Sequence, residues 1–137
     1  MNRNFPTRWQ PFGNLGNWQY AGSSAASEPE VQAMVRLGNL INPPLVIWYH
    51  QDYFRIAPST GREGVIRERF ASLVRLPLLE ITGGNYSGTG AMWSRSLQDP
   101  DGITLTVEFG PSPIRQGEAL WNASAVLTIV QEFFQGS

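Results

Sequence analysis

The sequence alternates between segments with the apolar spacing of a helix and segments with that of a strand, and this alternation restricts the fold class. Helical spacing occurs in residues 27–41, 62–76, 91–97 and 118–134, and strand-type runs occur in residues 45–49, 78–82 and 103–109. Strands separated by helices of this length favour parallel pairing, with the helices packed over the sheet. The sequence therefore predicts an α/β fold with a helix-covered, mainly parallel (mixed) sheet.

The two clearest strand segments differ in pattern. Residues 45–49 form a continuous apolar run that ends at His50, which is typical of a strand covered on both faces. Residues 103–109 alternate, with Ile103, Leu105, Val107 and Phe109 on one face and Thr104, Thr106 and Glu108 on the other. We therefore expect the second strand to have one polar face.

The apolar stripes of the helical segments predict which faces are buried. In residues 27–41 the stripe is Val31, Met34, Val35, Gly38 and Ile41. In residues 62–76 it is Val65, Ile66, Phe70, Leu73 and Leu76, with Arg67 on the outer face. In residues 118–134 it is Ala119, Leu120, Ala123, Val126, Leu127, Val130, Phe133 and Phe134.

Residues 1–26 show neither period but are rich in aromatic residues, so we expect an ordered loop region whose rings pack onto the protein. These rings are Phe5, Trp9, Phe12, Trp18 and Tyr20. Ser27 lies three residues before Glu30, which predicts a capping box at the start of a helix, with Pro29 in its first turn. No linker or repeat follows, so residues 1–137 are expected to form one domain with an α/β core over 27–137.

Charge and composition exclude several kinds of partner and site. Ten Lys and Arg against eleven Asp and Glu leave a net charge of -1, so we expect neither nucleic acid nor a membrane surface as a partner. The chain has no cysteine, which excludes disulfides and thiolate nucleophiles, and its single histidine excludes sites that need two imidazoles from this chain. Without a secretory leader or a membrane-spanning run, a soluble protein is expected, and its compartment stays open.

Three polar features follow the predicted strands, where ligands collect in open α/β sheets. His50 ends one strand, Glu108 lies near the end of another, and the glycine-rich loop 83–90 with Tyr86 follows the third. An imidazole and a carboxylate at one rim suggest a metal or general-base site. Each also has a structural interpretation, because a histidine at a strand end can simply be hydrogen-bonded and glycines occur wherever a chain turns.

Five segments together carry a family resemblance. Two are specific: Asn2-Arg3-Asn4-Phe5-Pro6, and Tyr20-Ala21-Gly22 followed by Ser27-Glu28-Pro29-Glu30-Val31-Gln32-Ala33. The others are the strand that ends at His50, the loop Gly88-Thr89-Gly90-Ala91-Met92-Trp93, and the strand Thr104-Leu105-Thr106-Val107-Glu108-Phe109. In order and spacing they resemble the M14 zinc carboxypeptidases, most closely the bacterial murein-peptide amidases. The resemblance implies the C-terminal portion of a metallocarboxypeptidase-like fold.

The resemblance also implies a role for each matching residue. His50 would be the third ligand of a zinc ion, and Glu108 would be the general base that takes a proton from a zinc-bound water. Asn2 and Arg3 would bind the free carboxylate of the substrate's C-terminal residue, and Tyr86 would cover the substrate. The implied activity is hydrolysis of the amide bond next to a C-terminal residue, in a peptidoglycan (murein) peptide or in an ordinary peptide.

The zinc-binding His-x-x-Glu pair of the family precedes its N-R-N-F-P element, with which this chain begins. We therefore expect an N-terminally truncated domain with an incomplete set of zinc ligands, and the isolated chain is predicted to be inactive. The alternative is a non-catalytic remnant that acts as a binding or interaction module. Loss of the earlier strands would expose a sheet edge, so self-association through that edge is a further expectation.

Overall fold

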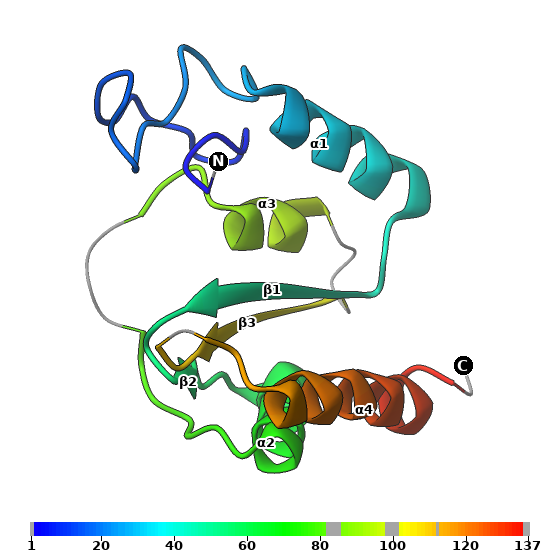
Figure 1. Ribbon diagram of the computed structural model, residues 1–137. Helices are drawn as coiled ribbons and strands as arrows, with labels where there is room; N and C mark the ends of the chain where they lie inside the picture. Colours follow the sequence, from blue (N-terminus) through cyan, green and yellow to red (C-terminus); the bar gives the residue numbers. More distant parts are fainter. Residues whose placement is uncertain (1, 82–85, 98–101, 112, 136–137) are drawn as a thin grey trace. The chain divides into compact units, whose positions relative to one another are not determined.

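The computed structural model describes residues 2–81, 86–97, 102–111 and 113–135. Its helices are α1 (Pro29–Ile41), α2 (Gly61–Val74), α3 (Gly90–Leu97) and α4 (Gln116–Phe133), and its strands are β1 (Leu45–Gln51), β2 (Arg55–Ile56) and β3 (Ile103–Phe109). Over the described residues the strands form a sheet of order β1-β3-β2. The expected mixed α/β class is confirmed (Figure 1).

Strand directions in the sheet are mixed. β2 runs antiparallel to β3, with Arg55 opposite Glu108 and Ile56 opposite Val107. The arrows of β1 and β3 point the same way in Figure 1. Because β3 lies between the other two strands, its residues have sheet neighbours on both sides, and this fixes the surroundings of Glu108.

The strand expected over residues 78–82 is wrong. Leu78 forms only an isolated parallel bridge to Ile56, and the last residue of the segment lies outside the described ranges. Backbone hydrogen bonds join Ile56 to Pro77 and to Leu79, each at 3.0 Å. Because β2 has only two residues, residues 78–82 can pair with it only at Ile56, which is too short a contact to make a strand.

Contacts divide the chain into two compact units. The first unit comprises Met1–Val46 and Gly83–Thr104, and the second comprises Ile47–Thr82 and Leu105–Ser137. In the first unit α1 packs against α3 at Gly38. A Cβ atom on Gly38 would lie 2.5 Å from the Trp93 indole, so the absence of a side chain permits this close approach. Phe5 stacks on the same indole, with its ring centroid 5.2 Å from that of Trp93.

The aromatic rings of the N-terminal loop region are not all packed. Phe5 is buried, and the Trp9 indole donates a hydrogen bond to the Ala21 carbonyl at 2.8 Å. The expectation is wrong for Phe12 and Trp18, which are 55% and 86% exposed. The segment around them is closed by its own backbone turns, in which Asn17 donates to the Asn14 carbonyl and Ala21 to the Phe12 carbonyl, each at 2.9 Å.

The start of α1 differs from the expected capping box. Glu28 is the N-cap residue, and Ser27 Oγ donates to Glu28 Oε1 instead of capping the helix. The backbone N–H of Glu28 donates to Asn4 Oδ1 at 3.0 Å. The N–H of the N-cap residue is therefore paired with a side chain distant in sequence, and no side chain caps the helix as the expected box would. Pro29 occupies the first turn as expected.

In the second unit α2 packs against α4, and the buried faces differ from those expected. The buried residues of α4 are Asn122, Ala125 and Ile129, whereas Leu120 and Leu127 are 61% and 65% exposed. Apolar residues occur on several faces of α4, so the contact with α2, rather than the periodicity, selects the buried one. Five other residues expected in the core are exposed as well: Ala119 and Ala123 of α4, Met34 and Ile41 of α1, and Val65 of α2.

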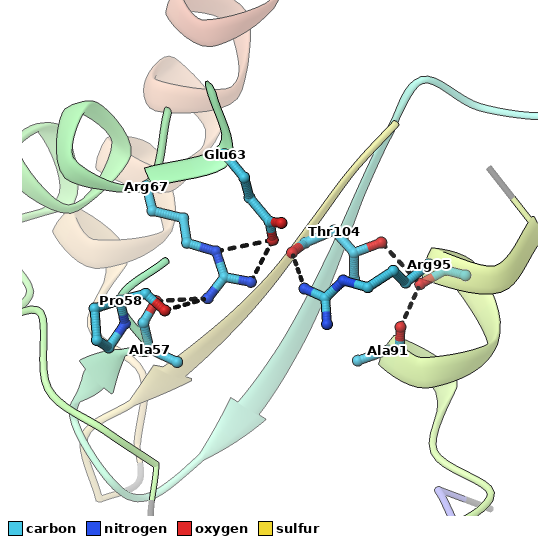
Figure 2. Close-up of polar contacts among 8 residues, drawn as sticks. Ala57, Pro58, Glu63, Arg67, Ala91, Arg95 and Thr104 are labelled. Carbon is cyan, nitrogen blue, oxygen red and sulfur yellow. Dashed lines mark hydrogen bonds and ion pairs between the residues drawn. The ribbon is translucent and has the colours of Figure 1, made fainter. Parts of the chain in front are cut away.

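Arg67 was expected on the outer face of its helix but is buried. Its guanidinium forms an ion pair with Glu63, one turn earlier in α2. It also donates to the carbonyl oxygens of Ala57, at 2.6 Å, and Pro58, at 3.3 Å (Figure 2). Each of these acceptors offsets part of the cost of removing the charge from water.

The burial of the strands also differs from expectation. Thr104 and Glu108 of β3 are only 1% and 6% exposed and Thr106 is half-buried, so most of the polar face of this strand is covered. The Thr104 hydroxyl pairs with Ser94 Oγ at 3.1 Å, and Figure 2 shows Arg95 beside the Thr104 carbonyl. β1 is half-buried instead of covered on both faces, because it lies at one end of the strand order.

Within the described ranges, no helix combines the length and apolar character needed to cross a membrane.

Candidate functional site

The sheet brings His50 and Glu108 onto neighbouring strands. His50 is the penultimate residue of β1, and Glu108 is the penultimate residue of β3. β1 lies next to β3 in the strand order, and both strands point the same way in Figure 1. The two residues therefore lie at the same end of adjacent strands, and His50 is partly exposed whereas Glu108 is buried.

The Glu108 carboxyl has an environment that favours its neutral form. Burial raises its pKa above the ordinary value of 4.5, and the nearby Asp52 carboxylate also raises it. The backbone N–H of Tyr53, which donates to the carboxyl, and the charge of Arg55 act in the opposite direction. Its Oε2 atom is buried and has no hydrogen-bond partner among the described residues, so it is an unsatisfied acceptor in the fold.

Arg55 is held opposite Glu108 by its own hydrogen bonds. Its Nε donates to the Tyr53 carbonyl and its Nη1 to the Glu80 carbonyl, each at 3.0 Å. Sequence reasoning missed both Asp52 and Arg55. The signal that could have found them is their place within five residues of His50: Asp52 lies in the segment that joins β1 to β2, and Arg55 is the first residue of β2.

A second group of candidate residues lies together in the other unit. The Arg3 guanidinium lies over the Tyr86 ring, 4.0 Å from its centroid, and also donates to the Asn2 carbonyl. Asn2 Oδ1 accepts the backbone N–H of Gly90 at 2.8 Å, which ties the N-terminus to the start of α3. Burial lowers the pKa of Arg3, and the neighbouring Tyr86 acts in the opposite direction. The structure thus brings Asn2, Arg3 and Tyr86 together.

Asn4, which follows Arg3 in the chain, ties the N-terminal segment to residues 21–28, and sequence reasoning assigned it no role. Its side chain is fully buried. It donates to the carbonyl oxygens of Ala21, at 2.6 Å, and Ser24, at 2.8 Å, while its Oδ1 accepts the backbone N–H of Glu28, the N-cap residue of α1. Gly22 lies against it with φ near +83°, and a Cβ there would overlap the Asn4 amide. The second Asn of the N-R-N-F-P element is therefore a structural anchor.

The resemblance implies a zinc ion, so the side chains that could ligate it decide whether the chain can hold one. A catalytic zinc ion needs three protein ligands. Among the described residues, no three His, Cys, Asp or Glu side chains gather closely enough to hold a metal ion. The described part of the chain does not by itself fit a catalytic zinc ion, and His50 is the one imidazole that the sequence can supply.

Comparison with known proteins gives a consistent result. No protein-family model matches the chain. It is 29% identical over 122 residues to murein peptide amidase A of Escherichia coli K12, and equally to that of strain O157:H7. The alignment covers 81% of this chain and 48% of each relative, so the chain spans about half the length of the curated relatives it matches.

Three solved structures share the fold over 95% of the chain. Murein-tripeptide amidase MpaA from Escherichia coli O157 superposes with a TM-score of 0.66 at 23% identity, and the match covers 56% of that chain. Carboxypeptidase A from Helicoverpa armigera gives a TM-score of 0.76 at 13% identity over 40% of that chain. Bovine thrombin-activatable fibrinolysis inhibitor gives a TM-score of 0.70 at 16% identity over 56% of that chain. The chain is therefore homologous to murein peptide amidase A and structurally similar to metallocarboxypeptidases, which confirms the resemblance found in the sequence.

Proposed function

We propose that the chain carries part of the active site of a zinc-dependent carboxypeptidase or amidase. The enzyme would hydrolyse the amide bond next to a C-terminal residue, with murein peptides as the substrate class. Homology to murein peptide amidase A and the metallocarboxypeptidase-like fold support this lineage. The observation that carries the proposal is Glu108, a buried carboxyl with an unpartnered oxygen, on the strand next to the one that bears the single histidine.

Glu108 would act as the general base. Because burial raises the pKa of its carboxyl, its proton affinity moves closer to that needed for proton transfer near neutral pH. Its unpartnered Oε2 would take a proton from the attacking water and return it to the leaving amine. The N–H of Tyr53 would keep the carboxyl oriented during both transfers.

Asn2 and Arg3 would bind the free carboxylate of the substrate. A guanidinium offers two parallel donors that match the two oxygens of a carboxylate. The Tyr86 ring already lies against the Arg3 guanidinium, so a carboxylate bound there would contact both side chains. Tyr86 would thereby cover the terminal residue of the substrate.

His50 is proposed as one ligand of the zinc ion. A bound zinc ion would lower the pKa of a water molecule so that it can attack at neutral pH. The remaining ligands would come from residues beyond those that the structure describes, because the described residues do not supply a set of three. For that reason the isolated chain is proposed to have no turnover.

Calorimetric zinc titration of this chain, combined with an amidase assay on a murein tripeptide, tests the proposal. We expect no turnover by the chain alone, and tight one-to-one zinc binding with turnover would contradict the proposed incomplete site.

Translation of the DNA that precedes the Met1 codon should reveal an in-frame His-x-x-Glu pair. A stop codon without that pair would favour the alternative, a non-catalytic binding or interaction module.

In the longer enzyme, Glu108→Gln should lower kcat by about 10²–10⁴-fold, the usual range for loss of a general base. The matched control is Glu68→Gln, which removes the same charge from an exposed position of α2. Equal kcat values for Glu108→Gln and the wild type would refute the assigned role.

Arg3→Gln should raise KM for a substrate with a free carboxylate more than for its amide, since only the carboxylate pairs with the guanidinium.

A further inference from the structure

A cavity of about 410 Å³ lies in the second unit, between the C-terminal end of α2 and the N-terminal end of α4. Its aromatic walls are Phe54, Phe109 and Trp121. Phe109 follows Glu108 in β3, so its side chain points to the opposite face of the sheet from the Glu108 carboxyl. The cavity has the size of a small-ligand site and does not use the residues of the proposed reaction.

The rim of this cavity is positively charged. Arg75 and Arg115 both line it, and the Arg75 guanidinium lies over the Trp121 ring at 4.5 Å from the centroid. The one carboxylate among the lining residues, Glu118, is engaged, because its Oε2 accepts the backbone N–H of Arg115 at 2.7 Å. The N-terminal end of α4 adds a partial positive charge. An anionic group is therefore the ligand feature that this rim favours.

The wall of the cavity also holds a buried polar atom that lacks a partner. Asn122 is 5% exposed, and its Nδ2 donates to the Glu118 carbonyl at 2.8 Å. Its Oδ1 is buried and makes no hydrogen bond within the described residues. A buried acceptor without a donor costs free energy, so the wall favours a ligand that brings an N–H or O–H group.

We propose that this cavity binds an N-acylated amino acid, or the C-terminal end of a short peptide, with an aromatic or branched apolar side chain. The side chain would lie among the three rings, the free carboxylate would pair with Arg75 and Arg115, and the amide N–H would donate to Asn122 Oδ1. The site does not depend on the zinc chemistry proposed above, so either proposal can fail without the other.

NMR titration of the ¹⁵N-labelled chain tests the site with three probes: N-acetylphenylalanine, its neutral amide, and 3-phenylpropionate, which lacks the N–H. We expect N-acetylphenylalanine to shift the Trp121 indole and Asn122 amide signals saturably. The neutral amide should bind about tenfold more weakly or worse, because it lacks the charged partner of the two arginines. This comparison uses the wild-type chain and needs no variant to fold.

Two exposed substitutions, Arg75→Gln and Arg115→Gln, should each weaken binding of the acid about tenfold and leave the neutral amide unchanged. Arg36→Gln, which removes the same charge from α1, is the control and should change neither. Asn122→Leu should weaken N-acetylphenylalanine but not 3-phenylpropionate. Absence of saturable shifts at Trp121, equal affinity for acid and amide, or an equal loss in Arg36→Gln would each overturn the proposal.

Discussion

At the residue scale, Glu108 couples the stability of the fold to pH. Its folded-state pKa is raised, so its contribution is fully present below the ordinary pKa of 4.5 and is lost as the pH rises through the higher folded value. Glu108→Gln removes the charge without changing the shape. We expect the variant to be more stable than the wild type at pH 8, by about 1 kcal/mol, and the difference to disappear at pH 4.

Urea unfolding at both pH values measures this effect. Glu68→Gln, at an exposed position of the neighbouring helix, is the control and should show no such pH-dependent gain. A Glu108→Gln variant that is less stable than the wild type at pH 8 would mean that the carboxylate is stabilised in the fold.

Asn4 offers a second prediction at this scale. Asn4→Ala removes the donors to the Ala21 and Ser24 carbonyls and the acceptor for the Glu28 N–H, and it leaves buried groups without partners. We expect a loss of about 1–3 kcal/mol in the free energy of unfolding. Asn39→Ala, at an exposed position of α1, should change it by no more than about 0.5 kcal/mol. Similar losses in the two variants would contradict the role of Asn4 as an anchor.

The sequence could name some of these residues and not others. The resemblance drew attention to Asn2, Arg3 and Tyr86, and the structure brings them together although Tyr86 is distant in sequence. It gave no role to Arg55, because the position of Arg55 opposite Glu108 depends on the register of a two-residue strand. So short a strand has no periodicity that a sequence pattern could detect.

At the scale of elements, the packing of α1 on α3 depends on one missing side chain. Gly38→Ala places a Cβ 2.5 Å from the Trp93 ring, and two helices must move apart to admit it. We expect a loss of about 1–3 kcal/mol despite the higher helix propensity of alanine. Gly117→Ala in α4 has no atom within 4 Å of the added Cβ, so it should instead stabilise by about 0.5 kcal/mol. Thermal unfolding of both variants checks the contrast, and a stabilised Gly38→Ala would show that the helices pack less closely.

The orientation of α4 gives a sharper test of the same kind. Ile129 is fully buried and Leu127 is 65% exposed. Ile129→Ala should therefore cost about 2–5 kcal/mol, whereas Leu127→Ala should cost less than about 1 kcal/mol. The sequence pattern predicted the reverse for Leu127. Denaturant titration of the pair decides between the two faces, and a larger loss for Leu127→Ala would favour the sequence-based assignment.

The elements themselves were more predictable than their faces. Strand 103–109 was expected with the bounds that β3 has, because strict alternation is a strong local signal. The buried face of α4 was not, since several of its faces carry apolar residues and the contact with α2 is a tertiary property. The strand expected at residues 78–82 failed for a related reason, as a strand exists only where a partner of similar length accepts its hydrogen bonds.

At the scale of the whole molecule, we propose that the chain self-associates through β1. In the part of the chain that the structure describes, β1 lies at one end of the strand order, and Tyr49 on it is 42% exposed. An edge strand with exposed apolar residues can pair with a second copy, and a lysine on the edge opposes such pairing. Sedimentation velocity over a concentration series should therefore show association of the wild type that Tyr49→Lys reduces. Leu127→Lys, on the exposed face of α4, should leave it unchanged. A wild type that stays monomeric throughout the series would contradict the proposal, and loss of association in Leu127→Lys alone would move the contact from the sheet edge to α4.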